Sequence, residues 1–329
     1  IDNVTTLLLI VPITISVFKT LKISPIPFIL AQVLASNVGG TATLIGDPPN
    51  ILIGSAANID FSSFIINMGP TVGISLFASL FILKFQFRKY LEQKPHNIED
   101  LLSQDEKVLI KDRSVLKKSL AVLLGVIFLF VIHGTINIEP SIIALSGAGI
   151  LMIVAKSRPE HVLRQVDWST LIFFAGLFII ISGAVKAGAI DLLSSIVLQI
   201  SGGNPWLLFF MIIWISAIAS AFMDNIPFAA TMIPLIFAIY NTESVAAVFG
   251  SLTINPLWWA LSLGVGFGGN GTLIGSSAGI VATGLVEING HRITFNQFLR
   301  VGFPFMIATV AVGSIVLLID VLLRLNLGV

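Results

Sequence analysis

The sequence predicts an all-α polytopic membrane protein built from two inverted repeats, each with a re-entrant helical hairpin and a broken transmembrane helix. Hydrophobic residues make up 56% of its 329 residues, charged residues 11%, and the mean hydropathy is +0.99, whereas soluble domains carry about 25% charged residues. Several apolar stretches reach the ~20 residues that a membrane-spanning helix needs. Within two such stretches a glycine-rich motif recurs, GGTATLIG at 39–46 and GGNGTLIG at 268–275, identical at six of eight positions. Glycine-interrupted membrane segments at matching places of two halves are typical of a transporter binding site.

Other features accompany both copies of the motif. Each is preceded by an Asp-Asn pair, at residues 2–3 and 224–225, and followed by a similar segment, FSSFIINMGP at 61–70 and FNQFLRVGFP at 295–304. The offset between the copies grows only slightly along the chain, which indicates small insertions. We therefore divide the chain into repeat 1 (1–87), a polar linker (88–118) and repeat 2 (119–329). Residues 119–223 have no counterpart before Asp2, so repeat 1 is expected to be truncated at its N-terminus.

Hydropathy predicts the individual elements. In repeat 1 we expect a hairpin arm at 4–18, a broken crossing at 27–56, an interfacial segment at 57–66 and a crossing at 68–87. In repeat 2 we expect crossings at 119–134, 141–155 and 168–187, an interfacial segment at 190–203, a hairpin with arms at 205–222 and 226–240, a broken crossing at 256–286, an interfacial segment at 288–300 and a last crossing at 301–323.

The charge distribution predicts the orientation. With the 88–118 linker in the cytoplasm, every Lys and Arg except Lys186 and Arg324 falls on the inner side of the membrane. Positive loops are retained on the cytoplasmic side. We therefore expect a multi-pass protein of the cell membrane with its C-terminus outside, and hairpins that open from opposite sides.

Glycine and proline explain why the two motif-bearing crossings should be broken. Glycine disfavours helix by about 1 kcal/mol, and the Pro48-Pro49 pair cannot donate helix hydrogen bonds. Irregular backbone at membrane depth is tolerated only where it is buried or lines a cavity. Half-helix ends then direct N–H dipoles and free carbonyls at a ligand. The alternative is close packing of small residues between helices, but the Asp-Asn pair before each copy favours a binding site.

Acidic residues at membrane depth give a second signal. Asp2, Asp47 and Asp224 have no Lys or Arg near them in the sequence, and such carboxylates usually mark an ion or proton path. The alternative is that Asp2 and Asp224 cap helices and that residues 47–50, Asp-Pro-Pro-Asn, form a rigid turn that caps the second half-helix. The counterpart of Asp47 is Ser276, so the halves differ chemically. The predicted substrate and ion site comprises Asp2, Asn3, Thr5, Asn37, Gly39, Gly40, Thr41, Thr43, Asp47, Asn50, Asp224, Asn225, Gly268, Gly269, Asn270, Thr272, Ser276 and Ser277.

Some classes of chemistry find no support in the sequence. The chain has no cysteine and four scattered histidines, which gives no pattern for a metal site. It also lacks the GxxxxGK[ST] phosphate-binding loop of an ATPase. We expect no enzymatic activity and no cofactor, with a proton or sodium as the coupling ion.

Four longer motifs carry a resemblance to a known family: SNVGGTATLIGDPPNILIG, VDWSTLIFFAGLF, AFMDNIPFAATMIPL and PLWWALSLGVGFGGNGTLIGSSAGIV. They resemble the arsenite-permease/P-protein branch of the ion transporter superfamily, which is related to dicarboxylate–sodium symporters and some sodium/proton antiporters. The resemblance covers essentially the whole chain. It implies a scaffold, a mobile transport domain that moves like an elevator, and a homodimer.

The hairpin tips depart from the dicarboxylate relatives. Those relatives have Ser-Asn-Thr at each tip, whereas this chain has Asp2-Asn3-Val4 and Asp224-Asn225-Ile226. Two carboxylates would repel an anionic substrate unless they are protonated or neutralised by cations. The departure favours a cation or a neutral solute such as arsenous acid.

The leading functional hypothesis is secondary active transport of a small inorganic ion, in the form of proton-coupled arsenite or antimonite efflux. Within the same fold the alternatives are a sodium/proton antiporter and a sodium-coupled di- or tricarboxylate transporter of the citrate type. A different class is a membrane subunit driven by a separate cytosolic ATPase that contacts the 88–118 linker. The partners expected are the lipid bilayer, the transported ion and a second copy of the chain, and no nucleic acid.

Overall fold

The computed structural model describes residues 2–93, 98–99, 112–164, 166 and 168–327. Within these residues the secondary structure is helical and contains no strand. The helices are α1 (Asn3–Leu21), α2 (Ile26–Gly40), α3 (Pro48–Ala57), α4 (Phe61–Gln86), α5 (Arg88–Leu91), α7 (Arg113–Ile136), α8 (Pro140–Val154), α9 (Pro159–Leu163), α10 (Trp168–Lys186), α11 (Ala189–Ser201), α12 (Pro205–Phe222), α13 (Asn225–Tyr240), α14 (Glu243–Phe249), α15 (Pro256–Gly268), α16 (Ser277–Ile288) and α17 (Phe295–Leu327).

Many of these helices fit a membrane. In the described part of the chain, six are long and apolar enough to span a bilayer, or up to seven if α13 and α14, which meet at 89°, form one bent span. The described side chains that are large, apolar and exposed are concentrated on such helices, for example Phe128 at 62% and Ile179 at 74%. The predicted polytopic membrane fold is therefore confirmed.

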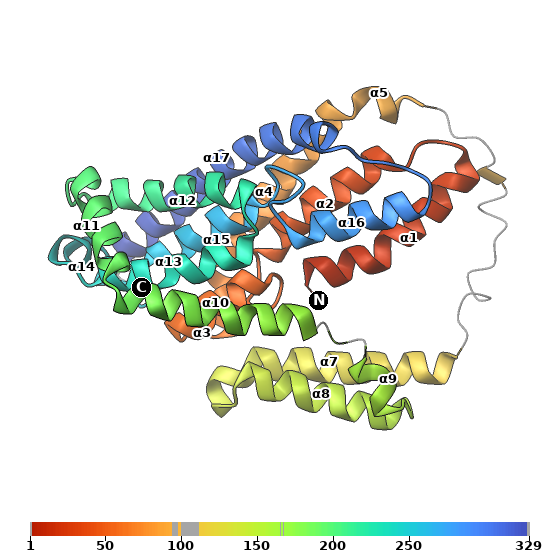
Figure 1. The fold of residues 1–329 in the computed structure, drawn as a ribbon, viewed down its shortest axis with the longest axis horizontal. Coiled ribbons are helices and arrows are strands. Elements are labelled where there is room, and N and C mark those ends of the chain that lie inside the picture. Colours follow the sequence, from red (N-terminus) through yellow and green to blue (C-terminus); the bar gives the residue numbers. More distant parts are fainter. Residues whose placement is uncertain (1, 94–97, 100–111, 165, 167, 328–329) are drawn as a thin grey trace.

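The central helices are arranged about the middle of the molecule. The pair α2–α3 runs through the middle from one end to the other, and the pair α15–α16 runs in the opposite direction (Figure 1). Helices α1 and α13 both begin near the middle and run away from each other. The beginnings of α1 and α13 and the interruptions within the α2–α3 and α15–α16 pairs thus lie near the middle of the molecule.

Helix α15 forms the most enclosed part of this centre, because all thirteen of its residues are buried. It packs closely on α12 through two glycines one turn apart. A Cβ at Gly264 would lie 2.5 Å from the Ile213 carbonyl oxygen, and one at Gly268 would lie 2.5 Å from that of Ala217. The close-packing alternative considered for the glycines is thus correct for Gly264 and Gly268.

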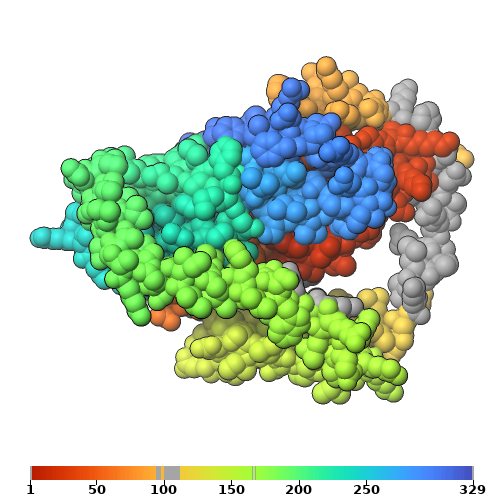
Figure 2. All heavy atoms as spheres, viewed as in Figure 1, coloured from red at the N-terminus to blue at the C-terminus, as the bar shows by residue number. Residues whose placement is uncertain are grey.

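The α7–α8 hairpin lies at the edge of the molecule, apart from the central helices (Figures 1 and 2). It is joined to α4 by side chains near the end of α7. His133 Nε2 accepts a hydrogen bond from the Phe61 N–H at 2.9 Å, and Ser62 Oγ donates to the Val131 carbonyl at 2.8 Å. The histidine therefore satisfies one of the free N–H groups at the start of α4.

The structure differs from the predicted elements at several boundaries. The interfacial segments expected at 57–66 and 288–300 are wrong as separate elements, because residues 61–66 belong to the long helix α4 and residues 295–300 to the long helix α17. Pro70 and Pro304 lie inside these helices, so neither proline ends its helix. The sequence analysis also missed α14. Residues 113–118, assigned to the linker, already belong to α7.

Candidate functional site at the two broken helices

The helix interruptions lie at 41–47 and 269–276, inside both glycine-rich motifs. Each ends at an extended residue that begins the next helix. Asp47, before α3, has φ −148° and ψ 135°, and Ser276, before α16, has φ −146° and ψ 139°. The two interruptions therefore leave their loops with nearly the same backbone geometry, although one residue is acidic and the other is a hydroxyl.

Glycine is required where each interrupted chain folds back on itself. A Cβ at Gly40 would lie 2.7 Å from the Gly46 carbonyl oxygen, and a Cβ at Gly269 would lie 3.1 Å from that of Gly275. The matching glycines of the two motifs thus make the same backbone approach. This gives the motif a structural reason that is independent of any ligand.

A chain of amide side chains joins the first hairpin tip to both broken helices. Asn3 Nδ2 donates to Asn37 Oδ1 at 3.1 Å, and Asn37 Nδ2 donates to both Asn270 Oδ1 and Ser276 Oγ at 3.0 Å. Asn270 Nδ2 in turn donates to the Leu34 carbonyl at 3.1 Å. All four of these side chains are buried, and most of their polar groups are paired within this network or with backbone carbonyls.

The corresponding contact on the other side is made by different residues. By the offset of the repeats, Asn37 corresponds to Gly266 and Asn270 to Thr41. Gly266 does lie against Thr41, so closely that a Cβ on the glycine would collide with the Thr41 hydroxyl. The structure therefore pairs the two broken helices through equivalent positions, with two amides in one contact and a glycine and a hydroxyl in the other.

The acidic residues gather beside this chain of amides. Asp47 is 2% exposed, and its two carboxylate oxygens lie 3.4 and 3.2 Å from Asn225 Nδ2. The Asn3 amide also lies beside the Asp47 carboxylate, and Asp224 and Asp2 are near enough to repel it electrostatically. Within the described residues, none of the ion pairs involves these three acids. The two hairpin tips and the first helix interruption thus each contribute one carboxylate, and none of the three has a basic partner among the described ion pairs.

Asp2 and Asp224 also cap the helices that they precede, as the alternative interpretation expected. Asp2 Oδ1 accepts from the Thr5 N–H at 2.6 Å, and Asp224 Oδ1 accepts from the Ile226 N–H at 3.0 Å. The other carboxylate oxygen of Asp224 accepts from Ser277 Oγ at 2.7 Å, which links the second hairpin tip to α16. Capping therefore uses only part of the hydrogen-bonding capacity of each carboxylate.

Asn50 holds the first interruption in place. Its Nδ2 donates to the carbonyls of Gly40, at 3.2 Å, and Thr43, at 3.0 Å, which are free because α2 has ended. Its Oδ1 accepts from Ser262 Oγ of α15 at 2.8 Å. The residue corresponding to Asn50 in the second half is Gly279, so this support exists in one half alone.

Not every predicted residue joins the cluster. The Thr5 side chain is exposed, and only its backbone N–H takes part. Thr272 Oγ1 donates to the Ala221 carbonyl at the end of α12. Gly268 packs on α12, and a Cβ at Gly39 would lie 4.0 Å from the Leu76 side chain. The side chains or Cα atoms of these four residues thus make no described contact with the amides of the polar centre.

Between the broken helices the amide side chains of Asn3, Asn37 and Asn270 contact one another directly. Two cavities, of about 410 and 210 Å³, lie at the α4–α5 junction and beside Trp259 and Asp320. The described residues do not place three His, Cys, Asp or Glu side chains around one metal position.

The predicted site did not include Ser262, Gly46, Gly266 or Gly275, although Gly266 and Gly275 belong to the glycines expected to break the second crossing. Ser262 is the polar residue of the apolar run WWALSLG and lies one turn before Gly266. A hydroxyl side chain within such an apolar run, on the helix that leads into the motif, indicates a residue that contacts the polar centre. Gly46 and Gly275 stand at the end of each motif and could have been found from the repeat itself.

Residues 1–264 match the family model described as citrate transporter (CitMHS). The chain belongs to the citrate transporter family. An uncharacterized transporter of Mycobacterium tuberculosis (strain H37Rv) is 42% identical over 316 residues, which are 96% of this chain and 72% of that protein. The 46 kDa membrane protein of Mycobacterium leprae is 39% identical with the same coverage.

A more distant similarity agrees with the sequence motifs. The P protein of Homo sapiens is 30% identical over 395 aligned positions, which are 97% of this chain and 46% of that protein. The predicted superfamily is therefore confirmed at the level of this citrate transporter family, and the chain is a multi-pass membrane transporter. Its assignment to the arsenite permease branch stays a prediction.

Proposed function

We propose that this chain is a secondary transporter that moves its substrate together with cations through the centre formed by the hairpin tips and the broken helices. The observation that carries the proposal is the gathering of Asp2, Asp47 and Asp224 without a basic partner. No Lys or Arg occurs in residues 23–83 or 187–291, which contain the whole centre apart from the first tip. Carboxylates that repel one another at membrane depth favour a bound proton or monovalent cation.

One unpartnered atom supports a cation at this place. Asn3 Oδ1 is buried and accepts no hydrogen bond within the described residues. It belongs to the same amide that lies beside the Asp47 carboxylate. A buried acceptor without a donor is costly by about 1–3 kcal/mol, and a sodium ion or a proton held between the two groups would remove this cost.

Citrate is the first candidate substrate, because the family to which the chain belongs is described as citrate transporters. Free citrate is a trianion, and three carboxylates would repel it. The site can accept it only if the charge is cancelled, and a divalent cation such as Mg²⁺ binds carboxylate oxygens well. We therefore propose that citrate travels as a complex with a divalent cation, coupled to protons or sodium.

Arsenous or antimonous acid is the second candidate. The observation that favours it is the set of uncharged polar side chains at the centre, in which Asn37, Asn270, Ser276 and Ser277 offer amides and hydroxyls. A small trihydroxy solute would be satisfied by such groups without a basic side chain. On this proposal the protein exports the metalloid in exchange for protons.

The transport cycle that we propose is elevator-like movement of two inverted repeats, in a homodimer. Support comes from the opposite directions of α2–α3 and α15–α16 (Figure 1) and from the matching backbone angles of Asp47 and Ser276. A separate ATPase that docks on the 88–118 linker is the alternative source of energy. Most of that linker lies outside the described residues.

A flux assay with the full-length protein in proteoliposomes tests the proposal. Citrate uptake should require Mg²⁺ or another divalent cation and should fall when the proton or sodium gradient is collapsed. Arsenite flux that depends on the proton gradient, with no citrate flux, would select the second candidate. Citrate uptake that proceeds equally well with a chelator present would show that the substrate enters without a divalent cation, which contradicts the proposed role of the carboxylates. Flux that needs ATP and a soluble partner would replace gradient coupling.

A further inference from the structure

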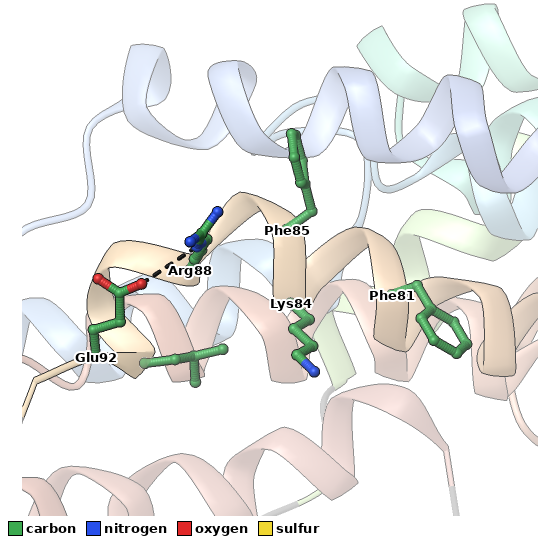
Figure 3. A pocket seen from close by; sticks show the side chains of 6 residues that line it. Phe81, Lys84, Phe85, Arg88 and Glu92 are labelled. Atoms are coloured by element: carbon green, nitrogen blue, oxygen red, sulfur yellow. Dashed lines mark hydrogen bonds and ion pairs between the residues drawn. The ribbon is translucent and has the colours of Figure 1, made fainter.

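One cavity of the structure lies away from the transport centre, where α4 meets α5. It has a volume of about 410 Å³ and is lined by Phe81, Lys84, Phe85, Arg88, Leu91 and Glu92. We call these six residues the elbow groove. Figure 3 shows Phe85 and Arg88 along one edge of the groove and Lys84 and Phe81 along the other.

The inner side of the elbow is fixed against the protein. Leu83 and Phe87 are buried, at 9% and 8% exposure. Gln86 Nε2 donates to the Val301 carbonyl of α17 at 3.1 Å, which ties the end of α4 to its long neighbour. The groove is therefore a preformed feature of the fold, because the backbone turn that shapes it is anchored by packing and a hydrogen bond on the opposite side.

The outer side of the elbow is strongly apolar and carries two cations. Phe81, Phe85 and Leu91 are 61%, 83% and 51% exposed. Arg88 Nε lies 3.3 Å from Glu92 Oε1, but both side chains are mostly exposed, and such a surface pair contributes little. The ammonium group of Lys84 has no acidic partner among the described ion pairs. The groove therefore keeps a net positive charge beside exposed phenyl rings.

The position of the groove along α4 matches the boundary of a bilayer. Helix α4 is an apolar span whose first basic residue is Lys84, in its last turn. The neighbouring ends of α1 and α17 carry further basic residues at this end of the molecule, Lys19 and Lys22 on one and Arg300 on the other. Lys and Arg at such a depth extend their stems along apolar surface and place their charges among lipid headgroups.

We propose that the elbow groove binds an anionic glycerophospholipid of the leaflet that faces the linker. Its phosphodiester lies between Lys84 on one edge and Arg88 on the other, and an acyl chain lies along Phe81 and Phe85. A zwitterionic lipid brings its own cation and so gains less from the two basic side chains. Free phosphate uses the same charges but leaves the exposed phenyl rings without a partner.

Native mass spectrometry of the intact purified protein tests the site with phosphatidylglycerol, phosphatidylcholine of the same chain length, and glycerol 3-phosphate. We expect retention of phosphatidylglycerol above the other two. The double variant Lys84→Gln/Arg88→Gln should weaken retention by roughly fivefold for each charge removed. Phe85→Ala should weaken phosphatidylglycerol retention as well. All three side chains are on the exposed side of the elbow, so thermal unfolding should be unchanged.

The matched control is Lys19→Gln/Lys22→Gln, which removes two charges at the same end of the molecule but outside the groove. It should leave phosphatidylglycerol retention unchanged. Equal loss in the control and in the groove variant would mean that the whole basic surface attracts lipid and would overturn the proposal. Equal retention of phosphatidylcholine, or of glycerol 3-phosphate, would also overturn it, in favour of a general lipid contact or a free anion.

Discussion

Single residues distinguish the two halves of the centre more than the backbone does. The N-terminal residue of each second half-helix has the same conformation, yet it is Asp47 in one half and Ser276 in the other. Asn37 bridges to the opposite motif with an amide, whereas its counterpart Gly266 has no side chain and admits Thr41. The charged and hydrogen-bonding groups of the centre are therefore concentrated in the first break. There, Asp47 accepts a hydrogen bond from the Asn225 amide and lies beside Asn3.

The sequence predicted most residues of this centre because polar groups at membrane depth are costly and thus conspicuous. It could not predict which of them pair. The contact from Asn37 to Asn270 joins residues 233 positions apart, and it depends on how two helices cross. Thr272 and Gly268 illustrate the limit, since both lie in the motif but contact α12.

Replacement of Asp224 separates its two tasks. Asp224→Asn keeps an oxygen that can cap the Ile226 N–H but removes the negative charge beside Asp47. We expect flux to fall at least about tenfold while the protein inserts normally, with a stability change below about 1 kcal/mol as for a conserved cap. Flux in proteoliposomes and thermal unfolding provide the two measurements. Unchanged flux would show that the carboxylate serves only to cap α13.

Asn225→Ala should act through a different residue. It removes the amide that lies 3.2 Å from Asp47 Oδ2, and an unsatisfied buried group costs about 1–3 kcal/mol. We expect flux to be abolished and stability to fall by this amount, and the double variant Asp47→Asn/Asn225→Ala to recover part of the stability but no flux. A double variant no more stable than the single variant would contradict a direct pairing of these residues.

At the scale of elements, the interrupted helices were predictable because glycine and proline mark them. The interfacial segments were wrong because short polar stretches such as FSSF and FNQF also suit the first turn of a long helix. Asp60 Oδ1 accepts from the Ser63 N–H at 2.6 Å, so the polar residues cap α4 rather than form a separate element. Composition alone does not separate these two cases.

The fold-back of the first interruption can be tested with adjacent glycines. Gly40→Ala would place a Cβ 2.7 Å from the Gly46 carbonyl oxygen, whereas Gly39→Ala meets only Leu76 at 4.0 Å. Overpacking of a closed site costs about 1–3 kcal/mol, so Gly40→Ala should lower the thermal midpoint and the flux. Gly39→Ala is the control and should change neither. If both variants have the same thermal midpoint and flux, the backbone at Gly46 must move aside at little cost when a Cβ is added at Gly40.

The imidazole of His133 makes one of the two hydrogen bonds that join α7 to α4 among the described residues. His133 is 8% exposed and accepts the Phe61 N–H, so His133→Ala leaves a helix N-terminus unsatisfied. We expect a loss of about 1–2 kcal/mol and easier proteolysis near Asn137. His133→Gln, whose side-chain oxygen can accept the same hydrogen bond, should recover part of the loss. If alanine and glutamine behave alike, packing rather than the hydrogen bond holds the junction.

At the scale of the whole molecule, two contacts define the antiparallel pairing of the longest helices. Gln86 near the end of α4 meets Val301 near the start of α17, and Arg324 near the end of α17 donates to the Ile66 carbonyl near the start of α4, at 3.4 Å. Both helices are long enough to span a bilayer. The end of α4 and the start of α17 must then lie on one side of the membrane, and the end of α17 on the other.

This pairing predicts which positions react from which side of a membrane. The chain contains no cysteine, so single cysteines can be labelled without background. Glu92→Cys and Asn289→Cys, both exposed, should react with a membrane-impermeant maleimide only from the cytoplasmic side, because the basic residues are concentrated there. Ser251→Cys and Asn326→Cys, also exposed, should react from outside in intact cells. If both pairs react from the opposite sides, the predicted orientation in the membrane is wrong but the fold is unaffected. If Glu92→Cys and Asn326→Cys react from the same side, the antiparallel crossing of α4 and α17 is contradicted.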